Sequence, residues 1–190
     1  MPRRAIQFNA GNFYHIYNRG NNRHAIFFER ENYFFFLEKL KLYFPPAVVR
    51  THAYCLMPNH FHLIVELLNE CSFSSLCKSL FISYTKAMNR RFGRTGHIFE
   101  GEFKSKIIDS TEYLLALSRY IHLNPSSAHL VQKPELWEFS SYAEYLGLRQ
   151  RTFAYSKFIL SHYQSVGEYK AFVESLSEKD FRKMENEFFK

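Results

Sequence analysis

The chain has 190 residues, of which 46% are hydrophobic, and a formal net charge of +7; this length fits one domain, with or without an appendage. No start resembles a signal peptide, and no apolar run approaches the roughly 18 residues that span a bilayer, which argues against a secreted or membrane-spanning protein. The three cysteines are odd in number and lack metal-type spacing, as is typical of buried free thiols in a reducing cytoplasm.

The positive charge lies entirely in the first two thirds of the chain. Residues 1–125 hold 16 Lys and Arg against 9 Asp and Glu, whereas residues 126–190 hold 9 against 9. A basic excess confined to one region predicts a polyanionic partner, most simply nucleic acid, although many basic proteins bind none.

The chain is expected to begin with a strand and a helix. Residues 12–19 have strand character, and the Asn and Gly residues at positions 20–23 predict a turn that presents Arg19 and Arg23. Over residues 30–44 apolar side chains recur at helical spacing until a Pro-Pro pair ends the predicted helix.

Two histidines of the next hairpin form the first candidate site. Residues 48–56 are predicted to form a strand that a short Pro-Asn turn connects to a second strand. Period-two alternation puts His60 and His62 on one face of this second strand and Phe61 on the other. Two imidazoles that point the same way suit one metal ion, although an isolated His-x-His in a strand more often serves packing and hydrogen bonding.

A long helix and a fourth strand follow, and both carry cations. Helical spacing predicts a helix that begins at Ser72 or Ser74. The C-terminal end of this helix contains no acidic residue. It is either a phosphate-binding surface or a solvated helix end whose cations interact favourably with the helix dipole. Residues 102–109 alternate as a strand. The cations are Lys86, Arg90, Arg91 and Arg94 at the helix end, and Lys104 and Lys106 on one face of the strand.

The next predicted helix carries a tyrosine and an asparagine on one face. It starts with Asp109 as candidate cap and Glu112 in the capping-box position, and it ends at Pro125. Tyr120 and Asn124 are four residues apart and therefore share a face. Because Asn124 precedes a proline, it is expected to leave the helical conformation and project from the helix end. The alternative is a core tyrosine and an Asn that merely ends the helix.

The order of these elements predicts the fold. The predicted order is strand, helix, strand, strand, helix, strand. This order is typical of an α+β, ferredoxin-like βαββαβ fold with an antiparallel sheet, and an extra helix follows it. If the two helices of the repeat cover the apolar face, the histidine face is left for the extra helix. Tyr120 and Asn124 would then meet His60 and His62.

Four ordered blocks with matching gaps resemble the REP-associated tyrosine transposases. These are insertion-sequence-type enzymes of the single-tyrosine HUH transposase superfamily, which work on single-stranded DNA. The resemblance covers residues 13 to about 148 and continues weakly towards Val173. The blocks are residues 14–20 (YHIYNRG), 54–62 (YCLMPNHFH), 96–105 (GHIFEGEFKS) and 113–125 (YLLALSRYIHLNP).

The resemblance implies a role for each candidate residue. His60 and His62 match the paired histidines that hold a divalent ion, Tyr120 matches the nucleophile, and Asn124 matches the third protein ligand. It also implies Mg²⁺ or Mn²⁺ as cofactor, a covalent 5′-phosphotyrosine, and single-stranded DNA with hairpins as partner. A bacterial, cytoplasmic and nucleoid-associated protein is expected, either monomeric or homodimeric.

DNA recognition is expected to use basic side chains, with surplus aromatic rings for stacking on unpaired bases. Two departures from the family pattern affect this surface: Glu100 and Glu102 stand where relatives often have Gln and Arg. A third departure is the run SSAHL at residues 126–130, which replaces a more usual VRAGL. The candidate phosphate contacts are Arg19, Arg23, Arg90, Arg91, Arg94, Lys104 and Lys106.

The C-terminal part is expected to be helical. Residues 1–150 are predicted to form the HUH tyrosine transposase domain, and residues 151–190 an extension that packs on it. Amphipathic patterns near residues 158–160 and 169–173 favour packing. The sequence leaves open whether the tail also shields the site or blocks the surface through which other HUH transposases dimerise.

Three hypotheses of function follow. The first is a metal-dependent transposase or endonuclease that cleaves and rejoins single-stranded DNA through Tyr120, with Tyr113 as the second-ranked nucleophile. The alternative is a non-catalytic DNA hairpin-binding protein that retains the fold. The third is a phosphohydrolase that uses water, for which Tyr120 is dispensable. The sequence names no general base, and Arg119 lies about 100° round the helix from Tyr120.

Overall fold

A four-stranded antiparallel sheet forms the centre of the computed structural model, which describes residues 7–150 and 153–189. The strand order is β2-β3-β1-β4, and every pair of neighbours is antiparallel. This is the arrangement of a ferredoxin-like βαββαβ repeat, so the predicted fold class is confirmed. The strands are β1 (Phe13–Arg19), β2 (Val49–Met57), β3 (His60–Leu67) and β4 (Lys104–Ile108).

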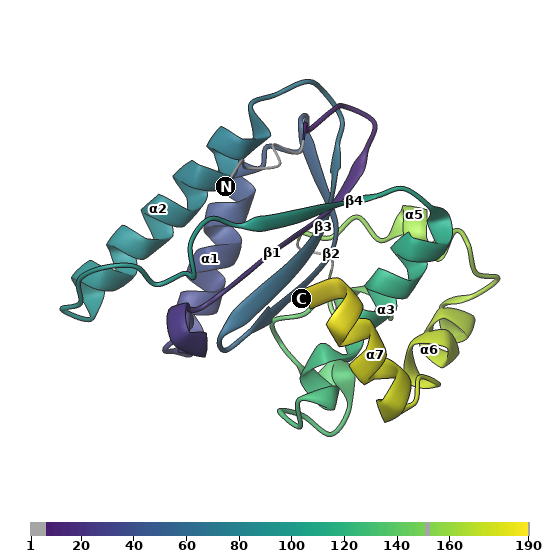
Figure 1. The fold of residues 1–190 in the computed structure, drawn as a ribbon. Coiled ribbons are helices and arrows are strands. Elements are labelled where there is room, and N and C mark those ends of the chain that lie inside the picture. Colours follow the sequence, from purple (N-terminus) through teal and green to yellow (C-terminus); the bar gives the residue numbers. More distant parts are fainter. Residues whose placement is uncertain (1–6, 151–152, 190) are drawn as a thin grey trace.

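Helices cover both faces of the sheet (Figure 1). Helices α1 and α2 lie on one face, and α3, α6 and α7 lie on the other. None of the helices within the described ranges has the length and apolar character needed to cross a bilayer. The helices are α1 (Arg30–Tyr43), α2 (Phe73–Arg91), α3 (Thr111–Ser127), α4 (Tyr142–Tyr145), α5 (Lys157–Leu160), α6 (Val166–Glu174) and α7 (Glu178–Phe189), with 3₁₀ turns at Asn21–Arg23 and Pro134–Leu136.

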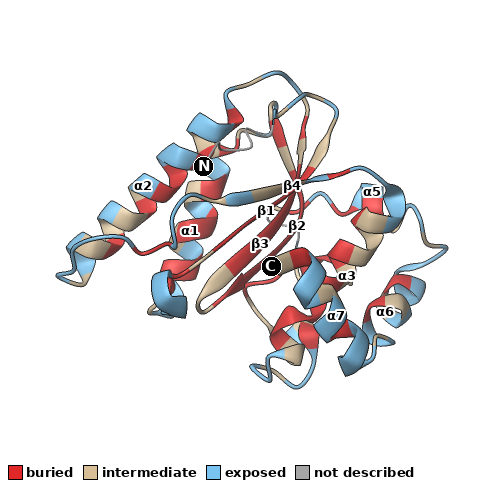
Figure 2. Cartoon of the chain, viewed as in Figure 1, coloured by how far each residue is buried: buried red, intermediate tan, exposed pale blue. Residues whose placement is uncertain are grey.

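The face of the sheet under α1 and α2 is an aromatic core. Phe61 is fully buried, and its ring centroid lies 5.3 Å from that of Phe36 on α1 and 5.5 Å from that of Phe81 on α2. Figure 2 shows that the inward sides of both helices are buried and the outer side of α2 is exposed. The two helices of the repeat therefore cover the apolar face, as the sequence predicts.

Helix α3 differs from its predicted bounds at both ends. Its N-cap is Ser110 and not Asp109, because the Ser110 hydroxyl accepts a hydrogen bond from the Tyr113 backbone N–H. At the other end the helix continues through Pro125 to Ser127. A proline so near the end removes only one backbone donor, and the Ala128 N–H still bonds the Asn124 carbonyl. Asn124 thus stays helical.

The C-terminal part is helical from α5 to α7, as expected. The division into a domain of residues 1–150 and an extension of residues 151–190 stays a prediction.

Candidate active site

Strand β3 presents His60 and His62 on the face opposite the aromatic core. In the antiparallel register His60 pairs with Arg19, and His62 pairs with Tyr17. The two imidazole centroids are 5.1 Å apart, with the rings nearly perpendicular. Strand alternation therefore places both rings as the sequence predicts.

Helix α3 brings Tyr120 and Asn124 onto the same face. The Tyr120 ring lies 5.3 Å from the His62 ring. Asn124 lies close enough to His60 and to Tyr120 to affect the pKa of both side chains. The structure therefore brings together four residues that lie up to 64 positions apart in the sequence, His60 to Asn124.

Burial controls the protonation of this cluster. It lowers the pKa of His60 to about 4, with a further lowering by Arg19 and a partial offset from the Asn124 hydrogen bond. It also lowers the pKa of His62 well below the ordinary value. Both imidazoles are therefore neutral at pH 7, the form that binds metals. Burial raises the pKa of Tyr120, so its phenol is protonated in this conformation.

The polar atoms of the cluster fit a divalent cation. His62 Nε2, which can offer a lone pair to a metal, is buried without a hydrogen-bond partner, which is unusual for a polar atom in a native fold. Across the described residues no group of three His, Cys, Asp or Glu side chains is placed to hold a metal. A third protein ligand would therefore be the amide oxygen of Asn124, beside the two imidazoles. Nitrogen and oxygen donors of this kind suit Mn²⁺ and Mg²⁺.

Two residues that contact the histidines were not singled out in the sequence. His15 Nε2 lies 2.9 Å from His62 Nδ1, and the Asn59 amide oxygen lies 2.7 Å from His60 Nδ1. Alternation within β1 puts His15 on the face of Tyr17 and Arg19. Only the register between β1 and β3, which the sequence does not give, makes it a neighbour of His62.

Helix α7 covers the cluster, which is one of the roles that the sequence leaves open for the C-terminal tail. Phe181 stacks on Tyr120 at 5.1 Å, and Phe188 contacts the same ring at 5.4 Å. Phe189 lies 4.8 Å from His60 and 5.0 Å from His62. As a result Tyr120 is only 1% exposed.

Four of the predicted DNA-binding cations lie near the histidines. Arg19, Lys104 and Lys106 share the histidine face of the sheet, because their register partners are His60, Tyr17 and His15. Arg23 is in the turn after β1, where its carbonyl accepts a hydrogen bond from the Asn59 amide. Two of these cations already have partners: Arg19 pairs with Glu100, and Lys106 donates to the backbone carbonyl of Glu187 on α7.

The other three predicted cations, Arg90, Arg91 and Arg94, are at the end of α2, in the opposite helix layer. Arg91 forms an ion pair with Glu29 at 2.5 Å, and the Arg94 guanidinium lies over the Phe28 ring at 4.7 Å. The structure does not bring this group to the histidines.

The two remaining candidates of α3, Arg119 and Tyr113, contact α6 and α7. Arg119 lies over the ring of Phe172 and hydrogen-bonds the Ser175 hydroxyl, so it faces α6. Tyr113 packs against Phe188, and burial raises its pKa to about 12.

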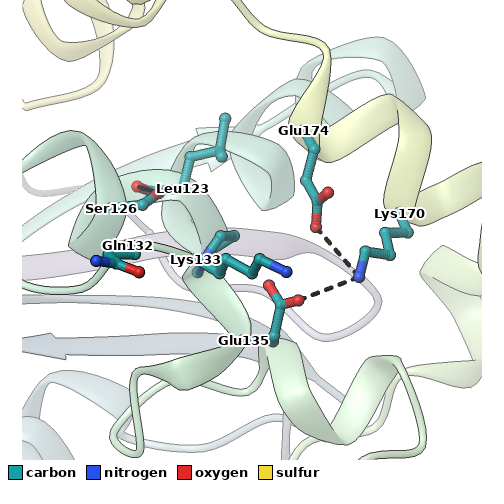
Figure 3. Close-up of a pocket in the computed structure, with 8 residues that line it drawn as sticks. Leu123, Ser126, Gln132, Lys133, Glu135, Lys170 and Glu174 are labelled. Atoms are coloured by element: carbon teal, nitrogen blue, oxygen red, sulfur yellow. Dashed lines mark hydrogen bonds and ion pairs between the residues drawn. The ribbon is translucent and has the colours of Figure 1, made fainter.

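A separate cavity of about 280 Å³ lies between α3, the 3₁₀ turn Pro134–Leu136 and α6 (Figure 3). Its charged groups neutralise one another, since Lys170 pairs with Glu135 at 3.1 Å and with Glu174 at 3.7 Å. None of the predicted site residues lines it.

Comparisons with known proteins concern the family and the fold. The family model described as "Transposase IS200 like" matches residues 11–124. The structure of a REP-associated tyrosine transposase bound to a REP hairpin matches with a TM-score of 0.63 and 21% identity, over 77% of this chain and 86% of that chain. A suspected transposase from Deinococcus radiodurans R1 matches with a TM-score of 0.44 and 16% identity, over 64% of this chain and 95% of that chain. No curated protein sequence matches.

Proposed function

This chain belongs to the IS200-like transposase family, and we propose that it cleaves and rejoins single-stranded DNA beside hairpins through a covalent bond to Tyr120. The observation that carries the proposal is the convergence of Tyr120 and Asn124 from α3 with His60 and His62 from β3. A potential nucleophile thus lies beside a set of neutral donor atoms.

Tyr120 is the proposed nucleophile. Its phenolic oxygen attacks the phosphorus, a bond to phosphorus forms, and the bond from phosphorus to the 3′-oxygen breaks. The products are a 5′-phosphotyrosine and a DNA end that takes up the proton as a 3′-hydroxyl. The reverse attack by this or another 3′-hydroxyl regenerates the phenol and joins strands, so no external energy source is needed.

His60, His62 and Asn124 are the proposed ligands of Mg²⁺ or Mn²⁺. When bound, the cation neutralises charge on the phosphate oxygens and so favours attack. All three ligands are neutral, so they leave the double charge of the cation available to the DNA. Three protein ligands would leave positions in the ligand shell for a DNA phosphate to complete, which predicts modest metal affinity without DNA.

The cations of the histidine face are the proposed phosphate contacts. Lys104 and Lys106 are in β4, Arg19 is at the end of β1, and Arg23 is in the turn that follows. A DNA hairpin is the natural probe, because the similar transposase structure is bound to a REP hairpin. Burial of Tyr120 under α7 favours the second candidate function, a hairpin-binding protein without chemistry.

The test is a denaturing gel of labelled, hairpin-bearing single-stranded DNA from the flanks of the gene, incubated with the protein and Mn²⁺. We expect a protein-linked DNA band that disappears with Tyr120→Phe and with chelator, and persists with the control Tyr113→Phe. Binding without any adduct or cleavage would favour the hairpin-binding protein. Cleavage that survives Tyr120→Phe would favour a hydrolase that uses water.

A further inference from the structure

The two proposed metal ligands of β3 are each held by a second residue through Nδ1 of the imidazole ring. His15 Nε2 lies 2.9 Å from His62 Nδ1, and the Asn59 Oδ1 atom lies 2.7 Å from His60 Nδ1. We infer that His15 and Asn59 are positioning residues that fix the tautomer and orientation of His62 and His60. This inference rests on the proposed function.

The Asn59 contact determines which nitrogen of His60 carries the proton. The Asn59 Nδ2 group donates to the Arg23 carbonyl at 3.2 Å, which identifies the other end of the amide as oxygen. Since a carbonyl oxygen only accepts, His60 must donate from Nδ1. The lone pair of its Nε2 is then available to a metal.

The His15 contact allows two arrangements for His62. If His15 donates from Nε2, His62 keeps its proton on Nε2, a buried atom without a partner in the described structure. If His62 donates from Nδ1, its Nε2 becomes a lone pair. A cation at this position selects the second arrangement, and His15 then serves as the acceptor that metal-binding histidines ordinarily have.

Packing holds the acceptor in place. His15 is fully buried, and its ring stacks on Tyr17 at 4.5 Å. The ring of His62 lies 5.1 Å away at an interplanar angle of 22°. His15 thus contacts the proposed ligand His62 and acts through it.

The test is Mn²⁺ affinity of the full-length protein, measured by titration calorimetry without DNA. His15→Phe keeps the stacking ring and removes the acceptor of His62. Asn59→Leu keeps the size of the side chain and removes the acceptor of His60. We expect each to weaken Mn²⁺ binding about 10- to 100-fold. His15→Gln and Asn59→Asp restore an acceptor oxygen and are expected to recover most of the affinity.

The control is His52→Phe, which removes another buried histidine of the sheet, one that pairs with Glu66. It is expected to leave Mn²⁺ affinity unchanged. If His15→Phe and Asn59→Leu bind Mn²⁺ as the wild type does, these residues only fill space and the inference fails alone. If the wild type binds no Mn²⁺, or if His60→Ala binds Mn²⁺ as tightly as the wild type, both this inference and the proposed metal-dependent function fail.

A different observation supports a second inference, which concerns α7. Its last turn lies against residues proposed to bind the metal and the DNA: Phe189 contacts both His60 and His62, and the Glu187 carbonyl accepts a hydrogen bond from Lys106. The outer side of α7 is exposed (Figure 2). We propose that α7 is an autoinhibitory cover that moves away when single-stranded DNA binds.

Hydrogen–deuterium exchange of the full-length protein tests this cover. With a hairpin-bearing single-stranded oligonucleotide, the amides of α7 should exchange faster while those of β4 become protected. Slower or unchanged exchange in α7 beside a protected β4 would overturn the proposal.

A variant gives a test that needs no DNA. Phe189→Ala should bind Mn²⁺ several-fold faster than the wild type, because it uncovers His60 and His62. The control Phe158→Ala, which removes a ring that packs on Phe13 and His52, should not. Equal association rates for wild type and Phe189→Ala would contradict a cover.

Discussion

The two faces of β3 differ in whether their buried atoms have the partners that they require. On one face Phe61 is buried against the apolar rings of Phe36 and Phe81. On the other face His62 is equally buried but leaves Nε2 without a hydrogen-bond partner. An unpaired buried polar atom destabilises a fold, so it persists where it serves another purpose. One strand thus contributes stability through one face and a candidate site through the other.

The largest expected effect is on the aromatic face. Phe61→Ala should lower the free energy of unfolding by about 3–5 kcal/mol, because it leaves a cavity among large rings. Mn²⁺ affinity of the folded fraction should stay at the wild-type value. Urea denaturation and calorimetry measure both quantities, and a parallel loss of metal affinity would mean that the two faces are not separable.

The opposite substitution sharpens the contrast. His62→Leu should weaken Mn²⁺ binding at least about 100-fold. It should change the free energy of unfolding much less than Phe61→Ala does, because the loss of the unpaired Nε2 offsets the loss of the Nδ1 contact with His15. A destabilisation as large as that of Phe61→Ala would identify His62 as a structural residue.

The third prediction concerns acid. Burial lowers the pKa values of His15 and His122 to about 3 and that of His60 to about 4, all on the α3 side of the sheet. Unfolded histidines titrate near 6.5, so below that pH the unfolded state binds protons that the folded state excludes.

The folded state therefore has its full stability above pH 6.5, where these histidines are neutral in both states. Its free energy of unfolding decreases as the pH falls towards 4. The slope should approach about 1.4 kcal/mol per pH unit for each histidine. Chemical denaturation between pH 7 and 4.5 measures it, and His122→Phe should reduce the slope. A stability that does not change over this range would show that these rings accept protons without unfolding.

The smallest effect is expected at the surface. Lys104→Ala on the histidine face should weaken hairpin DNA binding a few-fold and lower the slope of log affinity against log salt by about one. Lys39→Ala on α1, in the opposite layer, is the control. Fluorescence anisotropy at several salt concentrations measures the slope, and equal slopes for the two variants would place the DNA elsewhere.

Sequence patterns with short periods predicted most of the fold and the core of the site. Alternation placed His60 and His62 on one face, and helical spacing placed Tyr120 and Asn124 on another. The order of elements then predicted the sheet that brings them together. These inferences succeed because each depends on neighbours within one strand or helix.

The parts that could not be predicted depend on contacts between distant segments. His15 meets His62 only through the register of β1 and β3, which packing of the whole sheet determines. The amphipathic pattern of residues 178–189 shows that α7 packs on something, but not that its partner is Tyr120. The sequence predicts that the helix ends at Pro125, but it continues to Ser127, because a proline in the last turn of a helix removes only one hydrogen bond.

The most direct test of the central claim is mass spectrometry of the protein after reaction with hairpin-bearing single-stranded DNA and Mn²⁺, followed by nuclease and protease digestion. The account predicts a nucleotide remnant on Tyr120 in the peptide from α3, and none on Tyr113. A remnant on another residue, or cleaved DNA without any modified peptide, would contradict it.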